Sequence, residues 1–215
     1  MNKILLGLTT IGLFTLVGCG TNSVKIGEQE WMPENLNVDH FQNGDIIQEA
    51  KTKLEWEKAG KNKQPAWCYN DNNSSNGEKY GKLYNFYAVI DSRGLAPSGW
   101  HVPTDAEWTV LTDYSGANDH KGTEGDALKS KSGWNDKRDG TSGNGTDAYG
   151  WLGLPGGNRF FHGDFDNVGN GGGWWSSSEN ATYYAWFRYL DYSNDYLYRD
   201  HYNKEVGFSV RCLRD

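Results

Sequence analysis

The sequence predicts an α+β fold, in which helices and an early strand come first, long ordered loops follow, and a small antiparallel sheet closes the chain. Two observations carry this prediction. A strong helix-start signal precedes residues 104–115, and aromatic and polar residues alternate in three C-terminal segments, 183–190, 196–200 and 207–213. Short turn-forming stretches separate these segments, as is typical of neighbouring antiparallel strands.

The helix over 104–115 has the clearest signal. Thr104 is a good N-cap residue, and Glu107 follows at the spacing of a capping box. Trp108 and Leu111 then share one helical face, which we expect to point into the core.

The other elements before the C-terminal sheet are shorter. Residues 24–38 alternate around a glycine and predict a first strand or hairpin. Residues 45–62 have helical composition and predict a peripheral helix, and 125–133 predicts a second short helix. The polar stretch 70–81 predicts a loop, and the apolar stretch 82–90 predicts either a strand or a short helix.

The stretch 133–175 is rich in Gly, Asn and Asp, with aromatic residues at intervals. High glycine content can indicate disorder. The interleaved rings favour instead ordered loops that are held on a core by anchoring side chains.

The N-terminus predicts a bacterial lipoprotein. Lys3 and a short apolar run predict a signal peptide over 1–18 rather than a spanning helix. The residues that end at Cys19 match the lipoprotein signal, in which this cysteine is diacylated and becomes the new N-terminus. An ordinary signal peptide that contains a cysteine is the alternative. We expect a tether over 19–23 and a single domain over 24–215.

The lipid on Cys19 is the expected membrane contact, because no other apolar run approaches the length of a spanning helix. Gly20 follows the cysteine where an inner-membrane retention signal has Asp, which favours an outer-membrane anchor in the cell envelope, facing either the periplasm or the cell surface. A net charge of −7 and the lack of a Lys/Arg cluster argue against nucleic acid as a partner.

With Cys19 lipidated, Cys68 and Cys212 form an even pair in an oxidising compartment, which predicts a disulfide. The alternative is two buried free thiols. A cysteine metal site is not expected, because no CxxC or nearby His pair completes a ligand set.

Six blocks, in this order, resemble the Fibrobacter succinogenes major paralogous domain family: PAWCYN, YGKLYNFYAV, APSGWHVPTDAEW, LPGGNRF, WWSSSE and GFSVRCLRD. This family is similar in fold to C-type lectin-like domains and, more distantly, to formylglycine-generating sulfatase-modifying enzymes. The resemblance implies two main helices, a small antiparallel sheet and long ordered loops. Members are commonly exported or lipid-anchored proteins of Bacteroidetes-like bacteria, and their biochemical role is largely undefined.

A catalytic role is not expected. The oxygen-dependent relatives use a reactive cysteine pair, whereas the comparable stretch here has serines at 176–178. These serines, His101 or His162, and an acid form a triad only on paper, because no GxSxG nucleophile elbow is present. We expect His101 to hydrogen-bond a neighbouring loop rather than to transfer protons.

No cofactor is expected, although one loop offers weak calcium ligands. Asp164, Asp166 and Asn167 lie close together and carry the oxygen ligands that Ca²⁺ prefers. A network of Asx turns explains the same residues without a metal.

Aromatic residues near turns, strand edges and the glycine run form the candidate ligand surface: Trp174, Trp175, Tyr184, Tyr192, Tyr196 and Tyr198. Rings beside Asn, Asp and Arg suit the binding of a glycan or an envelope protein. The alternative is that these rings hold the long loops in place. The leading hypothesis is a lipid-anchored, non-catalytic recognition domain. Its rivals are an enzyme related to the sulfatase-modifying proteins and a structural subunit of a surface assembly.

Overall fold

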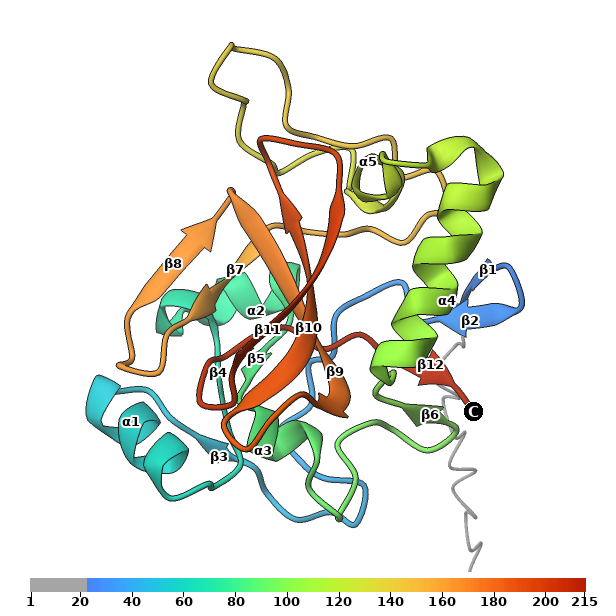
Figure 1. Ribbon diagram of the computed structural model, residues 1–215. Helices are drawn as coiled ribbons and strands as arrows, with labels where there is room; N and C mark the ends of the chain where they lie inside the picture. Colours follow the sequence, from blue (N-terminus) through green and yellow to red (C-terminus); the bar gives the residue numbers. More distant parts are fainter. Residues whose placement is uncertain (1–22) are drawn as a thin grey trace, which may run out of the picture.

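The chain is a mixed α+β structure, and the computed structural model describes residues 23–215 (Figure 1). The predicted signal peptide (1–18) and the predicted lipid-bearing Cys19 lie outside the described residues, as does all of the predicted tether except Ser23. Within residues 23–215, no helix has both the length and the apolar character needed to cross a bilayer.

One sheet joins the two ends of the described chain (Figure 1). Its strand order is β1-β2-β12-β6, and its strands are Val24–Ile26 (β1), Gln29–Trp31 (β2), Leu213–Arg214 (β12) and Trp100–His101 (β6). The β1–β2 hairpin confirms the predicted first hairpin, and its turn contains Gly27 at φ 61°, a conformation that glycine adopts without strain. The predicted strand 207–213 is confirmed only at its end. Residues 207–209 instead pair with three different segments as isolated bridges.

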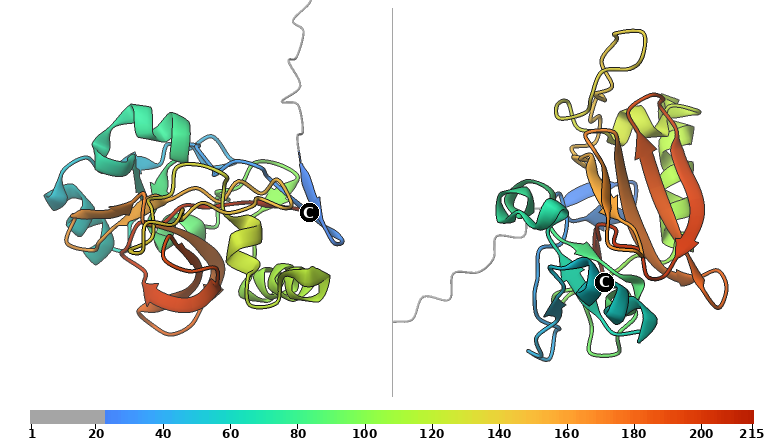
Figure 2. Two further views of the ribbon diagram at one scale, coloured as in Figure 1. Left: turned by 90° about the horizontal axis from the view of Figure 1, so that it is seen from above. Right: turned by 90° about the vertical axis from the view of Figure 1, so that its left-hand side faces the viewer.

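The largest sheet has the order β11-β10-β9-β7-β8. Its strands are Gly156–Arg159 (β7), Phe165–Val168 (β8), Gly171–Glu179 (β9), Tyr184–Asp191 (β10) and Leu197–Asn203 (β11). Strands β10 and β11 confirm the first two strands of the predicted meander, and their antiparallel register pairs Tyr189 with Tyr198. Helix α4 (Asp105–Ser115) lies along one face of this sheet in both views of Figure 2.

The third sheet is small and has the order β3-β4-β5, with strands Gln48–Glu49 (β3), Ala66–Cys68 (β4) and Leu83–Tyr84 (β5). The prediction of one small antiparallel sheet is therefore wrong, because residues 23–215 form three sheets, with parallel pairing between β3 and β4 and between β7 and β9. Strands β7, β8 and β9 arise from the stretch predicted as loops. Glycine and asparagine occupy many of their positions and hide the apolar alternation that marks a strand.

Helix α4 forms as predicted. The Thr104 side chain accepts a hydrogen bond from the Glu107 amide, and the Glu107 carboxylate accepts one from the Thr104 amide. Trp108 and Leu111 are buried, as their helical spacing predicts. A short π-helical segment (Gly116–His120) and α5 (Glu124–Leu128) follow, so the second predicted helix is present but is shorter than 125–133.

Helix α1 (Lys53–Lys61) corrects the predicted helix over 45–62. The helix begins only after Thr52, whose side chain caps the amide of Glu55 in a second capping box. The predicted apolar stripe is wrong because Ile46 is 75% exposed and Leu54 76% exposed.

The predicted polar loop over 70–81 is a short 3-10 turn (Asn70–Asn72) followed by α2 (Ser74–Tyr80). Asn73 caps α2 through the amide of Ser75. Residues 82–90 fulfil both alternatives, since they contain β5 and then α3 (Phe86–Val89).

Tryptophan dominates the core between α4 and the largest sheet. Five indoles are buried there together: Trp31, Trp108, Trp134, Trp151 and Trp174. The ring centroids of Trp31 and Trp108 lie 4.8 Å apart, and those of Trp151 and Trp174 lie 5.0 Å apart at 65°. Each aromatic pair of this kind adds about 0.5–1.5 kcal/mol beyond its area burial. This packed core therefore supports the five-stranded sheet from the side of α4.

Candidate functional site

The two faces of the five-stranded sheet differ in what covers them. Side chains of alternate residues in a strand point to opposite faces. Arg188 and Leu190 of β10 lie on the face toward α4, whereas Phe187 and Tyr189 lie on the other face with Tyr198 of β11.

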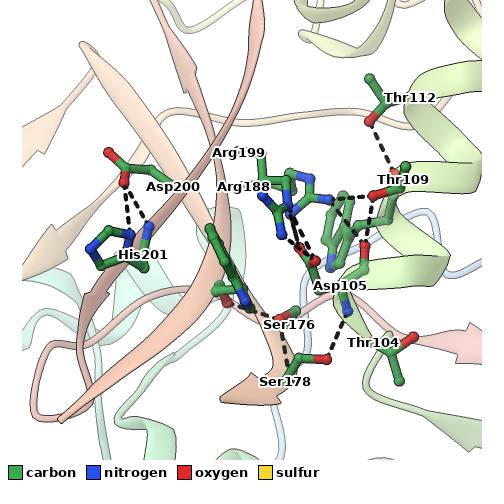
Figure 3. Close-up of polar contacts among 12 residues, drawn as sticks. Thr104, Asp105, Thr109, Thr112, Ser176, Ser178, Arg188, Arg199, Asp200 and His201 are labelled. Carbon is green, nitrogen blue, oxygen red and sulfur yellow. Dashed lines mark hydrogen bonds and ion pairs between the residues drawn. The ribbon is translucent and has the colours of Figure 1, made fainter. Parts of the chain in front are cut away.

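The face toward α4 is closed by a charged cluster (Figure 3). Arg188 is 1% exposed and donates to Oδ1 of Asp105 over 2.7 Å, and Arg199 donates to Oδ2 of the same carboxylate over 2.8 Å. Burial acts to raise the pKa of Asp105, but its hydrogen bonds with the two arginines outweigh it and hold the pKa below the usual value. The cluster therefore fixes the first turn of α4 on β10 and β11.

The serines at 176–178 form an irregularity in β9, where the β9–β10 register shifts. The hydroxyl of Ser176 donates to the carbonyl of Trp186 over 2.9 Å, and Oγ of Ser178 accepts the amide of Asp105 over 3.0 Å (Figure 3). These hydroxyls therefore join β9 to β10 and to the start of α4.

The face away from α4 carries two adjoining cavities, which we call the aromatic groove. The first, of about 210 Å³, is lined by Asn158, Phe160, Asn167, Phe187, Tyr189, Tyr202 and Phe208. The second, of about 360 Å³, is lined by Phe187, Tyr189, Asp191, Ser193, Asn194, Tyr198, Arg199 and Asp200. The cavities share Phe187 and Tyr189 in their lining, so they lie side by side, and both are open to solvent.

The glycine run of β9 makes room for the rings of this groove. A Cβ on Gly171 would lie 2.7 Å from Cε2 of Tyr189, and a Cβ on Gly173 would lie 2.6 Å from Cδ1 of Phe208. Both distances are too short for carbon atoms, so these positions exclude a side chain. The rings of Tyr189 and Phe208 therefore lie directly over the β9 backbone.

Neighbouring rings hold one another in place. Phe208 stacks on Phe187 with centroids 4.6 Å apart and planes at 5°, and Tyr202 meets Phe187 edge-on at 6.0 Å. Tyr198 and Tyr202 form the accessible rim, at 42% and 36% exposed. The groove thus has a buried aromatic floor and two exposed rings.

Polar groups stand between the rings. Nδ2 of Asn167 donates to Oδ1 of Asn158 over 2.9 Å in the first cavity. The hydroxyl of Tyr189 donates to Oδ2 of Asp191 over 3.1 Å in the second. Burial, reinforced by Asp191, raises the pKa of Tyr189, which therefore stays a neutral donor.

The turn between β10 and β11 carries one wall of the groove. Lys129 and α5 bind this turn through hydrogen bonds. The buried Lys129 donates from Nζ to the carbonyl of Asn194 over 2.8 Å and pairs with Asp195 at 3.5 Å. Burial lowers the pKa of Lys129. The amide of Gly125, in α5, also donates to the carbonyl of Asp195.

The prediction that Trp174 and Trp175 lie on the ligand surface is wrong. Trp174 and Trp175 are fully buried on opposite faces of β9, a central strand that is covered on both sides. Their indole nitrogens donate to Oδ1 of Asn35 and to the carbonyl of Tyr84. The glycine run beside them is therefore covered by aromatic rings rather than open to solvent.

The four tyrosines of the predicted ligand surface do not lie at one site. Tyr198 lines the groove. Tyr196 is exposed beside Tyr198, and the centroids of these two rings lie 6.0 Å apart. Tyr184 is exposed but lies against His201, outside the groove, and Tyr192 is half-buried against the tryptophan core.

Sequence reasoning missed most of the groove. The missed residues are Asn158, Phe160, Phe187, Tyr189, Tyr202 and Phe208, together with Asp191, Ser193, Asn194, Arg199 and Asp200. The alternation of residues along the strands could have predicted some of these positions. Phe187 and Tyr189 are in phase along one strand, as are Tyr198 and Tyr202 along the next. Antiparallel pairing then brings these four rings to one face.

The weak calcium candidates have other partners. The carboxylate of Asp164 pairs with Lys53 and His162, and Oδ1 of Asp166 accepts the amide of Asn167. Asn167 instead lines the first cavity of the groove.

The predicted disulfide between Cys68 and Cys212 is wrong for this structure. Both cysteines are free and buried, and they lie in separate core clusters, Cys68 with Trp56 and Cys212 with Phe208. Burial raises the pKa of each thiol to about 12, so both stay protonated.

His101 forms hydrogen bonds, but its partners lie in α4 and at the end of the chain rather than in a neighbouring loop. Nδ1 lies 2.9 Å from Oδ1 of Asp215, and Nε2 lies 3.0 Å from Oε1 of Glu107. The imidazole therefore connects the last residue of the chain to the first turn of α4.

The fold and the groove define a class of protein: an α+β protein with an aromatic groove on one face of its main sheet. Within residues 23–215, no group of three or more His, Cys, Asp or Glu side chains is placed to hold a metal ion. The chain belongs to the Fibrobacter succinogenes major domain family, whose model matches residues 24–214, and this confirms the family predicted from the motifs. Comparison with curated proteins and with solved structures finds no significant match.

Proposed function

We propose that this chain is a non-catalytic recognition domain, anchored to the cell envelope by a lipid on Cys19, and that it binds a glycan or protein ligand in the aromatic groove. One observation carries the proposal: Tyr198 and Tyr202, on the same face of β11, stand exposed over a floor of buried rings. Exposed rings with polar neighbours are typical of recognition surfaces, because they supply contact area at a low cost in conformational entropy.

The outer-membrane location and the C-type lectin-like assignment are part of the proposal. Gly20 after the lipoprotein signal supports the location, and the resemblance of the ordered motif blocks supports the fold assignment.

Tyr198 and Tyr202 are the residues to change in a test. The full chain carrying Tyr198→Ala and Tyr202→Ala is compared with the wild type on an array of neutral glycans, acidic glycans and peptides. Loss of two stacking rings is worth about 2 kcal/mol, so binding falls at least about tenfold. Because both side chains are partly exposed, we expect the variant to keep its fold, which circular dichroism checks.

The matched control is Tyr183→Ala with Tyr184→Ala, since these tyrosines are 65% and 44% exposed and lie outside the groove. The control binds like the wild type. An equal loss in both variants, or binding unchanged in the groove variant, contradicts the proposal.

A further inference from the structure

We infer that the ligand of the aromatic groove is a neutral oligosaccharide that occupies both cavities, with Tyr189 between its two subsites. This inference rests on the proposed recognition function and specifies the chemical class of the ligand.

The charges of the groove favour a neutral ligand. Asp191 and Asp200 line the second cavity. Among the described residues that line the groove, Arg199 is the one basic residue, and its guanidinium is bonded to Asp105 toward α4. Two carboxylates without a free cation repel sulfated, phosphorylated or uronic acid ligands.

The polar groups of the groove suit hydroxyls. The amides of Asn158 and Asn167 lie in the first cavity, and Asp191, Ser193 and Asn194 lie in the second. A carboxylate oxygen accepts more than one hydrogen bond, so Asp191 can accept from a ligand while it holds Tyr189. A sugar hydroxyl both donates and accepts hydrogen bonds, and an amide group offers a partner for each role.

The two rim rings set the length of the ligand. Tyr198 and Tyr202 are four residues apart in β11, which places them about 13 Å apart along the strand. This distance is longer than one sugar ring, so a ligand that stacks on both tyrosines has several units. The apolar face of one sugar then meets Tyr198 in one cavity, and the apolar face of another sugar further along the chain meets Tyr202 in the other.

A peptide is the competing ligand. Peptides that bind sheets commonly add a strand to an exposed edge through main-chain hydrogen bonds. The edge strands of this sheet are β11 and β8, whereas the cavities lie on the sheet face between them. A groove built from side chains on the face therefore favours a ligand recognised by stacking.

Calorimetry with the full chain tests the inference. The probes are cello-, xylo-, manno- and chito-oligosaccharides, each as a disaccharide and a hexasaccharide, with heparin fragments and oligogalacturonate as the acidic set. We expect at least one neutral series to bind, the hexasaccharide at least about tenfold more tightly than the disaccharide, with little change at high salt. Tyr198→Ala lowers the hexasaccharide affinity toward that of the disaccharide, and Tyr183→Ala leaves it unchanged.

The outcomes separate the two proposals. Groove-dependent binding of peptides or acidic glycans, with no binding of the neutral series, overturns the ligand class and leaves the recognition function standing. Neutral oligosaccharides that bind equally well to the Tyr198→Ala and Tyr202→Ala variants overturn both. Equal affinity for disaccharide and hexasaccharide overturns the two-subsite arrangement.

Discussion

Gly173 is a position where one added carbon atom would disturb the floor of the groove. The Cβ of a Gly173→Ala variant would lie 2.6 Å and 2.9 Å from Cδ1 and Cε1 of Phe208. Carbon atoms pack at about 3.5–4.0 Å, so the ring must retreat by about 1 Å. Phe208 has little room to do so, since it stacks on Phe187 at 4.6 Å and meets Trp175 at 4.8 Å.

Overpacking of this kind costs about 1–3 kcal/mol. In a domain of this size, 1 kcal/mol lowers Tm by about 3 °C, so we expect Tm to fall by about 3–9 °C. Urea unfolding followed by tryptophan fluorescence gives the free energy of unfolding directly.

A double-mutant cycle with Phe208→Ala assigns the cost to the ring. Without the ring, Gly173→Ala meets no obstacle there, and its cost falls to a few tenths of a kcal/mol. If Gly173→Ala is equally destabilising in both backgrounds, the steric reasoning about the groove floor is refuted.

Three further predictions follow from buried or bridging groups. Arg211 is fully buried and donates to four main-chain carbonyls and one side-chain oxygen, so Arg211→Met lowers the free energy of unfolding in urea by about 3 kcal/mol or more. Arg138→Met, at an exposed position, changes the free energy by less than about 0.5 kcal/mol. Cys68 and Cys212 react with a maleimide only after unfolding, and a peptide pair linked under non-reducing conditions would contradict the free-thiol structure. Partial burial lowers the pKa of His101, but its hydrogen bonds with two carboxylates outweigh this and raise the pKa above 6.5. The stability it contributes is therefore complete below about pH 6.5 and lost as the pH rises through the folded pKa, and His101→Gln removes this slope from thermal melts.

Local signals predicted the elements that are specified by neighbouring residues. Thr104 and Glu107 set the start of α4, and the same device at Thr52 and Glu55 sets the start of α1. The capping box at Thr52 was present in the sequence and would have corrected the predicted start at residue 45.

Other elements depend on contacts that no local pattern carries. Helix α2 forms from a polar stretch, and Gly77 lets it pack closely against the ring of Tyr69. Strands β7 and β9 pair in parallel through glycines, where a sequence pattern offers no alternation to read.

The sequence by itself determined the family, the capped helix α4, the two hairpins and the composition of rings and amides from which the groove is built. Only the tertiary structure decided which rings are accessible. Trp174 and Trp175 point to opposite faces of a central strand that is covered on both faces, and both are buried. Tyr198 and Tyr202 lie on one face of an edge strand and are exposed. The physical reason is that exposure depends on what packs against a strand, and those neighbours are brought there by residues far away in the chain.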